Sequence, residues 1–374
     1  MSKHVNYGLI GCGMMGQEHM RNISLLPNAS VTIFFDPDPK MASLAQAITP
    51  TAKRAATIKV LLAEPNLDCL LIISPNFRHV EQIMAIMETR PLPLMVEKPL
   101  FTCPENTTHL TEIRKNYPSP IWVAMEYRYM PVISHFLEKA NKTTGGIKMI
   151  SIREHRFPFL KKVGDWNRFN RFTGGTFVEK CCHFFDLMRF VLNAEPVRVM
   201  ASASQDVNHL SETYAGETPD IIDNGYVIVD FDNGARGMLE LCMFAEGSTY
   251  QEELSAVGPC GKIEAYVPGP GRFWPEHLGT PPVAKLVTSP RNPKGPEIRK
   301  VVVDSKLLEA GDHNGATFYQ HQKFAALVRG DTNKVEVSLS DGWAAVAIGL
   351  AAQQSARTGQ SVNPEQWMQP CLSI

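Results

Sequence analysis

A glutamate, a histidine and an aspartate follow one another at helical spacing near the middle of the sequence. Glu179, His183 and Asp186 stand four and three residues apart, so a continuous helix would place them on one face. His183 suits a general base for a hydroxyl proton, because the unperturbed pKa of histidine is near neutrality. We expect Glu179 to orient His183 or to bind a neighbouring hydroxyl, although such residues on helices are also common as solvated ion pairs.

A lysine in a short polar segment is the second residue that can take part in catalysis. Lys98 lies in Glu97-Lys98-Pro99, directly after an apolar run at residues 93–96. A lysine there can stabilise negative charge that develops on an oxygen, and Pro99 restricts the backbone beside it. We therefore expect Lys98 to be catalytic together with His183 and Glu179, although it could also be an ordinary loop lysine.

Metal ligands are few in the sequence. Glu179, His183 and Asp186 could hold an ion, but no second cluster of histidines or cysteines accompanies them, so we expect no metal. The eight cysteines are scattered and contain no C-x-x-C pair, which disfavours a zinc site or a disulfide framework. A reducing compartment, the cytoplasm, fits this pattern best.

A glycine pattern near the start of the chain predicts a dinucleotide site. Gly11, Gly13 and Gly16 fit G-x-G-x-x-G, and the pattern lies between an apolar run and a helical run. The glycines permit a tight turn and close approach of a pyrophosphate, which also contacts the helix start at Met14 and Met15. A glycine-rich turn without a ligand is the alternative.

An aspartate twenty residues further on indicates which dinucleotide is bound. Asp36 ends the second apolar run, where a carboxylate accepts hydrogen bonds from the adenosine ribose and repels a 2′-phosphate. NAD is therefore favoured and NADP is less expected, although the nearby Lys40 softens the preference.

These motifs together resemble the glucose–fructose oxidoreductase / inositol dehydrogenase family (Gfo/Idh/MocA). The resemblance rests on four segments. These are the glycine motif, Glu97-Lys98-Pro99, Ser74-Pro75-Asn76 with His79, and residues 174–187, where a Gly-Gly pair precedes Glu179, His183 and Asp186. It implies a Rossmann domain followed by a domain with an open sheet. It also implies that Lys98 and His183 are catalytic and that the cofactor is bound by Ser74, Pro75, Asn76, His79, Glu97 and Lys98.

Two positions depart from the family pattern. Glu179 stands where the family usually has aspartate, and Cys181 stands where glycine is usual. The longer acid can reach a different hydroxyl, and the thiol side chain can reshape the floor of the pocket. Both departures affect the expected substrate more than the expected chemistry.

Further residues are candidates for substrate contact. They follow a predicted strand end, lie in a loop before the Gly-Gly pair, share the helical face of His183 or precede a late helix. A sugar ring suits such a mixture of aromatic and polar groups. A surface loop or a helix cap is an equally good explanation for several of them. The candidates are Tyr127, Arg128, Trp166, Arg168, Asp186 and His313.

The first third of the chain has the pattern of a parallel sheet covered on both faces. Continuous apolar runs alternate there with helical patterns, which is typical of a doubly wound α/β fold. Strands are expected at residues 5–11, 30–35, 67–73, 93–96 and 121–125, and helices at 14–26, 40–48 and 79–89. We assign residues 1–125 to an NAD-binding Rossmann domain.

Residues 126–374 are expected to form an α+β domain for substrate binding and oligomerisation. Its strands form a largely antiparallel sheet, with Asp232-Asn233-Gly234 as a hairpin signal. A stretch rich in Pro and Gly, residues 268–296, is expected to be a long surface loop. Strands are expected at residues 147–155, 197–205, 226–232, 235–243, 252–257 and 262–268, and helices at 317–329 and 340–357.

Composition excludes several partners. The 374 residues carry a formal net charge of -1, without blocks of like charge that would attract nucleic acid or an anionic membrane. No run is apolar and long enough to span a bilayer, and the first residues lack the pattern of a secretion signal. The resemblance implies a homodimer or homotetramer.

The function that fits these residues is reversible hydride transfer between NAD and a ring secondary alcohol of a sugar, a sugar derivative or an inositol. Oxidation is expected to become faster as a histidine-like group loses its proton. Two alternatives stay open: a redox-neutral glycoside-cleaving enzyme with tightly bound NAD, and a dinucleotide-binding protein without catalysis.

Overall fold

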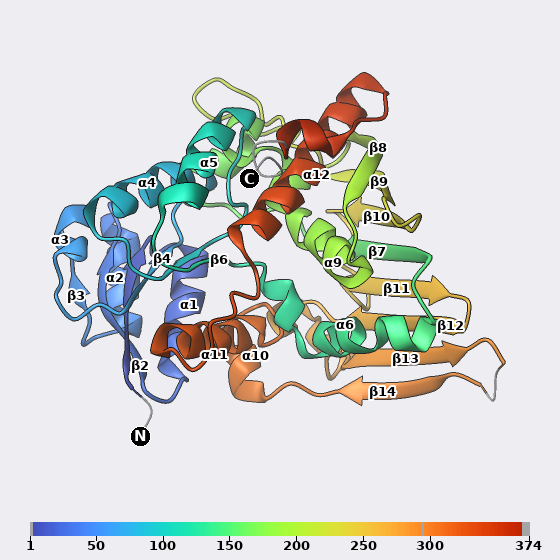
Figure 1. Cartoon of the computed structure of the whole chain (residues 1–374), viewed down its shortest axis with the longest axis horizontal. Coiled ribbons are helices and arrows are strands. Elements are labelled where there is room, and N and C mark those ends of the chain that lie inside the picture. The colour runs from blue at the N-terminus through green and yellow to red at the C-terminus, as the bar shows by residue number, and fades with distance from the viewer. Residues whose placement is uncertain (1–2, 293–294, 369–374) are drawn as a thin grey trace.

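A parallel six-stranded sheet forms the N-terminal part of the computed structural model, which describes residues 3–292 and 295–368. Its strand order is β3-β2-β1-β4-β5-β6, the order of a dinucleotide-binding sheet. The sheet and its helices lie on the left of Figure 1, beside the second part of the chain. Strands β1 and β4 are buried almost without alternation, because helices cover both faces. The strands are β1 (Val5–Ile10), β2 (Ala29–Phe35), β3 (Lys53–Arg54), β4 (Cys69–Ile72), β5 (Leu94–Val96) and β6 (Ile121–Val123).

The helices of this part begin where the sequence supplies caps. Asp38 accepts hydrogen bonds from the backbone of Lys40 and Met41, and Thr57 accepts one from Val60, so both fix helix starts. The helices are α1 (Met14–Ser24), α2 (Pro39–Ile48), α3 (Ile58–Leu62), α4 (His79–Thr89) and α5 (Thr107–Asn116). The predicted doubly wound fold is confirmed, while β3, α3 and α5 had no strong periodic signal.

A second, eight-stranded sheet follows in the order β14-β13-β12-β11-β7-β10-β9-β8. Its neighbours are antiparallel except β7 and β10, which run parallel. The predicted hairpin turn joins β9 to β10, with Gly234 at φ +80°. The strands are β7 (Met149–His155), β8 (Pro196–Ser204), β9 (Asn224–Phe231), β10 (Arg236–Cys242), β11 (Glu252–Gly258), β12 (Gly261–Val267), β13 (Ala284–Pro290) and β14 (Glu297–Val301).

The expectation of a long loop at residues 268–296 was wrong. Strand β13 lies inside that stretch and pairs with β12, while two short 3-10 turns precede it. Pro290 ends the strand, and Leu286 and Ala284 are buried under the sheet. The prolines and glycines therefore mark the turns on either side of one buried strand. Residues 293–294 of the stretch lie outside the described residues.

Helices cover one face of the second sheet. Helix α12 packs on β8, and α6 packs on β12 and β13, while α11 returns to pack against α1 of the first part (Figure 1). The helices are α6 (Pro131–Thr144), α7 (Asn170–Thr173), α8 (Thr176–Glu179), α9 (Cys182–Leu192), α10 (Ser305–Ala310), α11 (Ala316–Arg329) and α12 (Leu339–Thr358). The 3-10 turns are η1 (Asn76–Arg78), η2 (Pro104–Asn106), η3 (Glu126–Tyr129), η4 (Val163–Arg168), η5 (Gly271–Phe273), η6 (Glu276–Leu278) and η7 (Pro364–Trp367).

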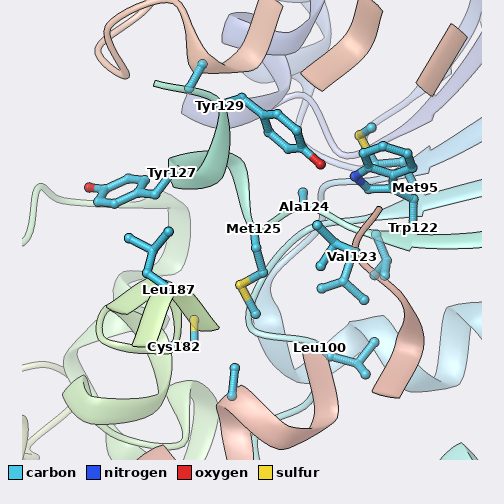
Figure 2. Packing of buried hydrophobic residues seen from close by; sticks show 14 of the residues in the cluster. Met95, Leu100, Trp122, Val123, Ala124, Met125, Tyr127, Tyr129, Cys182 and Leu187 are labelled. Carbon is cyan, nitrogen blue, oxygen red and sulfur yellow. The ribbon is translucent and has the colours of Figure 1, made fainter. Parts of the chain in front are cut away.

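The turn η3 joins the two parts through a shared core. Figure 2 shows Tyr127 and Tyr129 pointing to opposite sides of this segment, with Tyr127 beside Leu187 of α9. Tyr129 faces Trp122 of β6, with ring centroids 6.1 Å apart (Figure 2). One buried apolar cluster therefore continues from the first sheet into α9, and it fixes the residues of η3 against both parts.

The helices of the described residues include none with the length and apolar character needed to cross a membrane. All seven of their cysteines are free thiols, and Cys371 lies outside the described residues.

Candidate active site

A cleft of about 900 Å³ opens at the carboxyl ends of the parallel strands. Loops that follow β1, β2, β4 and β5 meet there, as the topology of a parallel sheet requires. Ten residues predicted to bind the cofactor line this cleft: Gly11, Gly13, Met14, Met15, Asp36, Ser74, Pro75, Asn76, Glu97 and Lys98.

The glycine turn is shaped for close approach by a ligand. Gly11 has φ +101°, and a Cβ atom there would lie 2.5 Å from the carbonyl oxygen of Ile73. A Cβ on Gly16 would lie 2.4 Å from the Gly11 carbonyl, so this glycine lets α1 pack against the turn and does not line the cleft. Space beside Gly13 is open to 4 Å, which leaves room for a pyrophosphate at the start of α1.

Asp36 holds this turn in place from the end of β2. Its Oδ2 accepts a hydrogen bond of 2.6 Å from the Cys12 amide, and its Oδ1 accepts one of 2.8 Å from the Asp38 amide. The carboxylate lines the cleft and retains further lone pairs for a ribose diol. The glycine turn and Asp36 thus fit a dinucleotide whose ribose carries no 2′-phosphate.

His79 lies behind the cleft, where it supports the loops and does not line the wall. Its ring nitrogens contact the carbonyl oxygens of Pro99 at 2.8 Å and Ser74 at 3.0 Å, and its side chain is fully buried. It thereby ties the loop after β4 to the loop after β5. Glu97 is anchored from the other side by His19, whose Nε2 lies 2.9 Å from Oε1 of the glutamate.

Lys98 and Glu179 meet at one end of the cleft. The Lys98 ammonium donates a hydrogen bond of 3.2 Å to the main-chain oxygen of Glu179, one of the free carbonyls at the end of α8. The Glu179 carboxylate points instead to Lys162, with Oε1 and Nζ 3.0 Å apart, while Oε2 has no partner. Glu179 is thus a cleft residue and forms no hydrogen bond with His183.

The expectation that Glu179, His183 and Asp186 share one continuous helix was wrong. Helix α8 ends at Glu179 and α9 begins at Cys182. The amide of Cys181 reaches back five residues to the carbonyl of Thr176, which widens the turn and interrupts the α-helical pattern. The interruption gives Glu179 and His183 different surroundings.

His183 is buried and has no hydrogen-bonding partner among the described side chains. Its exposed fraction is 1%, and its Nδ1 atom is buried without a partner. The Tyr127 ring stacks on it, with centroids 4.1 Å apart and planes 8° apart. Burial holds the pKa of His183 well below 6.5, and the charge of Lys98 lowers it further. His183 is therefore neutral near pH 7, the protonation state that a base requires.

Asp186 and Arg128 pair with each other. The guanidinium donates two hydrogen bonds, of 2.6 and 2.5 Å, to the two carboxylate oxygens, and both side chains are buried. Arg128 also donates to the Glu336 carbonyl at 2.8 Å. This pair fixes η3 to α9, and neither residue lines the cleft.

The other substrate candidates are spread around the site. Trp166 lines the cleft, with the Lys162 ammonium 4.4 Å from its ring centroid. Arg168 is buried away from the cleft and donates a hydrogen bond of 3.0 Å to Glu212. Substrate contact by Trp166 stays a prediction, and Arg168 instead anchors a neighbouring loop.

His313 bridges two buried carboxylates. Its Nδ1 lies 2.7 Å from Glu18 Oε1, and its Nε2 lies 3.5 Å from Glu126 Oε1. Thr317 Oγ1 contacts both carboxylates at 2.9 Å. The three ionisable residues could each offer one atom to a metal ion. In this arrangement the imidazole ring occupies the position between the carboxylates.

Comparison with protein families agrees with this geometry. A family model described as the NAD-binding Rossmann fold of an oxidoreductase family matches residues 5–125. The model for the C-terminal alpha/beta domain of the same family matches residues 140–363. The chain belongs to the Gfo/Idh/MocA oxidoreductase family. The predictions of an NAD-binding domain and of an oxidoreductase are thereby confirmed.

Individual relatives of this oxidoreductase are distant. The uncharacterized oxidoreductase YrbE of Bacillus subtilis is 26% identical over 244 residues, 64% of this chain and 67% of YrbE. Inositol 2-dehydrogenase 2 of Saccharopolyspora erythraea is 24% identical over 372 residues, 98% of each chain. A solved levoglucosan dehydrogenase in complex with NADH has a TM-score of 0.78 at 18% identity, covering 96% of this chain and 99% of that one.

Several groups in this oxidoreductase were not found from the sequence. They surround Tyr127 and Glu179, and they are Lys162, Lys180, Glu154 and Glu252. A signal existed for the two glutamates. Glu154 lies on the same buried face of its strand as Ile152, and Glu252 lies on the same buried face as Leu254. An acidic side chain on the buried face of a strand needs a partner or has a function. No pattern of spacing pointed to the lysines.

Proposed function

We propose that this oxidoreductase is an NAD-dependent dehydrogenase acting on a ring secondary alcohol of a sugar, a sugar derivative or an inositol. The observation that carries the proposal is the meeting of Lys98 and Glu179 at the end of the dinucleotide cleft, with the Lys98 charge acting on His183. Relatives that bear the name inositol 2-dehydrogenase support the substrate class.

Each of these residues has a separate role in alcohol oxidation. NAD, when bound, accepts the hydride from the alcohol carbon. Neutral His183 takes the hydroxyl proton, and the Lys98 ammonium stabilises the negative charge that develops on the oxygen. Glu179 offers its unpartnered Oε2 to a neighbouring hydroxyl of the ring. Because His183 is buried in this structure, substrate binding must bring the hydroxyl to it through the Lys98 end of the cleft.

A substrate panel tests this proposal. The purified protein is mixed with NAD or NADP and with inositols, free sugars, sugar acids and sugar phosphates, while NADH fluorescence is followed. We expect accumulation of NADH with at least one polyol. Cleavage of an aryl glycoside without accumulation of NADH would favour the redox-neutral reaction instead. Tight dinucleotide binding without any turnover would favour a non-catalytic protein.

The assembly that we propose is a homodimer or homotetramer formed through the outer face of the second sheet. Exposed apolar side chains lie on this face on four adjacent strands, with Val257 opposite Met149 and Met238 opposite Ile228. The exposed residues are Met149, Tyr226, Ile228, Met238 and Val257. Such a patch is typical of a protein interface. Light scattering at micromolar concentration tests this assembly, and a monomer would contradict it. The free thiols favour the cytoplasm as its location.

We also propose a domain boundary near residue 125. The first sheet ends at Val123, and η3 carries the chain into the second part. Limited proteolysis followed by mass spectrometry tests this boundary.

A further inference from the structure

A buried ammonium group lies between the second sheet and η3. Lys180, in the turn between α8 and α9, is 4% exposed, and its Nζ lies 2.8 Å from Glu154 Oε1. The same ammonium donates a hydrogen bond to the phenolic oxygen of Tyr127. A buried lysine is costly unless its charge is paired, and Lys180 has one ion-pair partner and one hydrogen-bond acceptor.

The acids around Lys180 are paired across two strands. Glu154 of β7 stands directly opposite Glu252 of β11, and both are almost fully buried. Burial raises the pKa of Glu252 to about 7, and the charge of Glu154 acts in the same direction. Two cationic groups lie beside these carboxylates: Lys180, and Arg156, whose Nη1 is 3.6 Å from Glu154 Oε1.

Tyr127 connects this cluster to the base. Its hydroxyl accepts a hydrogen bond from Lys180 and donates one of 3.2 Å to Glu252 Oε1. Both hydrogen bonds fix the rotation of the phenol ring, and one face of that ring stacks on His183. Since His183 Nδ1 has no hydrogen-bonding partner, the stack with Tyr127 is a contact that holds the plane of the imidazole ring.

Cationic groups surround His183 from four segments of the chain. Burial is the largest cause of its lowered pKa, followed by the charges of Lys98 after β5, Lys180 before α9, His313 before α11 and Arg156 after β7. An imidazolium would also carry an N–H on Nδ1, which is buried without an acceptor. Burial, charge and hydrogen bonding all oppose protonation of His183.

We propose that Lys180 is a positioning residue for His183: through its contacts with Glu154 and Tyr127 it fixes the stacked phenol ring and keeps a positive charge beside the base. The inference rests on the proposed dehydrogenase function for its catalytic meaning. It assigns the orientation of the histidine to an aromatic ring and a lysine, because Glu179, the acid that spacing suggested for this task, pairs with Lys162.

Nuclear magnetic resonance tests the proposal without any substrate. The ring signals of isotope-labelled histidine are titrated in the wild type and in Lys180→Met, and His183→Gln identifies the signal among the 11 histidines. The wild-type His183 signal should stay that of a neutral ring well below pH 6.5, because burial lowers its pKa. In Lys180→Met its midpoint should rise by about one pH unit or more, because a like charge has been removed.

Two further variants separate positioning from folding. Lys180→Met leaves Glu154 uncompensated, so the double variant Lys180→Met/Glu154→Gln removes both charges of the pair and should fold where the single variant does not. It should show a smaller rise in the His183 midpoint, because loss of the Glu154 anion offsets part of the loss of the Lys180 cation. Lys180→Arg retains the cation and should return the midpoint toward its wild-type value. An identical His183 titration in the wild type and in either Met variant would overturn the proposal.

Steady-state kinetics supply the second readout. With the best polyol of the panel, Lys180→Met should lower kcat about 10- to 100-fold, with unchanged KM for NAD, and should move the acid limb of the pH profile upward. A lower kcat with an unmoved profile would show a merely structural role and overturn the proposal. If the His183 titration shifts as expected while the wild type oxidises no polyol, the proposed function fails and the role of Lys180 stands.

Discussion

The ammonium of Lys98 donates a hydrogen bond to the main-chain oxygen of Glu179, 81 residues further along the chain. This bond joins the loop after β5 of the first sheet to the end of α8 in the second part. It places a cation at the cleft end where the dinucleotide site meets the proposed substrate site. The carbonyl groups at a helix end carry partial negative charge and favour this cation.

Replacement of Lys98 tests its role in charge stabilisation. Lys98→Met should lower kcat for polyol oxidation by about 100- to 1,000-fold, because the developing negative charge on the oxygen loses its cationic donor. The measurement is the initial rate of NADH formation at saturating NAD. Lys142→Met, on the exposed end of α6, is the matched control and should retain wild-type rates. Wild-type kcat in Lys98→Met would contradict the mechanism.

Replacement of His183 tests the identity of the base. His183→Gln should lower kcat by about 100- to 10,000-fold, because no other described group is assigned to take the hydroxyl proton. Since His183 does not line the cleft, the Kd for NAD, measured by calorimetry, should stay within about twofold of the wild-type value. Turnover that survives in this variant would exclude His183 as the base.

The pH dependence of oxidation follows from the burial of His183. The sequence predicted a rise in rate through a histidine-like ionisation. The lowered pKa instead means that the base is already neutral in mildly acidic solution, so kcat/KM should show no His183 step between about pH 6 and 8. A rise centred near 6.5 that disappears in His183→Gln would contradict this expectation.

The sequence predicted the cofactor half of the site better than the substrate half. Cofactor residues follow strand ends of one parallel sheet, so Gly11, Asp36 and Lys98 must converge once the strands are recognised. The surroundings of His183 depend on a helix interruption at Lys180 and on Tyr127, which comes from a distant turn. Spacing alone assumes a continuous helix and cannot show that Glu179 turns toward Lys162.

In the fold, too, local sequence patterns predicted some elements and missed those that depend on tertiary contacts. Strong periodic patterns predicted five of the six strands of the first sheet and most strands of the second, often within two residues of the observed ends. Strand β13 was missed because its composition is dominated by flanking turns, and β14 is mostly exposed. Pairing with β12 stabilises β13, a tertiary effect that local sequence does not carry.

Asp36 should determine cofactor choice. Asp36→Asn keeps an oxygen acceptor for the Cys12 amide but removes the charge, so NAD binding should weaken about 10- to 100-fold. NADP binding should weaken less or improve, because repulsion of its 2′-phosphate disappears. Calorimetry with both dinucleotides gives the ratio of Kd values. Asp230→Asn, on the outer face of the second sheet, should leave that ratio unchanged, and an unchanged ratio in Asp36→Asn would refute the assignment.

The Arg128–Asp186 pair should matter for stability. Asp186→Asn removes the charge that compensates a buried guanidinium, so the free energy of unfolding should fall by about 3–5 kcal/mol. Glu217→Gln breaks the exposed pair between Glu217 and Arg171 and should cost less than about 1 kcal/mol. Urea unfolding of the two variants gives the comparison. Equal losses of unfolding free energy would show that the buried pair contributes no more to stability than the exposed pair.

His313 should make stability fall in alkaline solution. Burial opposes its charge, but the charges of Glu126 and Glu18 outweigh burial and raise the pKa of His313 from 6.5 to about 9. A group whose pKa is higher in the folded protein stabilises it fully below the unfolded value of 6.5, and this contribution is lost as pH rises through 9. The shift corresponds to roughly 3 kcal/mol at most.

The variant that isolates this effect is His313→Gln, which keeps a hydrogen-bonding group beside Glu18 but cannot become charged. At pH 6.5 it should be less stable than the wild type by about 2–3 kcal/mol, because Glu18 loses its cation. Since deprotonation removes the same cation from the wild type, the difference should shrink between pH 6.5 and 9 and be almost absent above 9. Urea unfolding at several pH values measures it, and groups other than His313 cancel in the difference. A constant difference would mean that His313 is not charged in the folded protein at neutral pH.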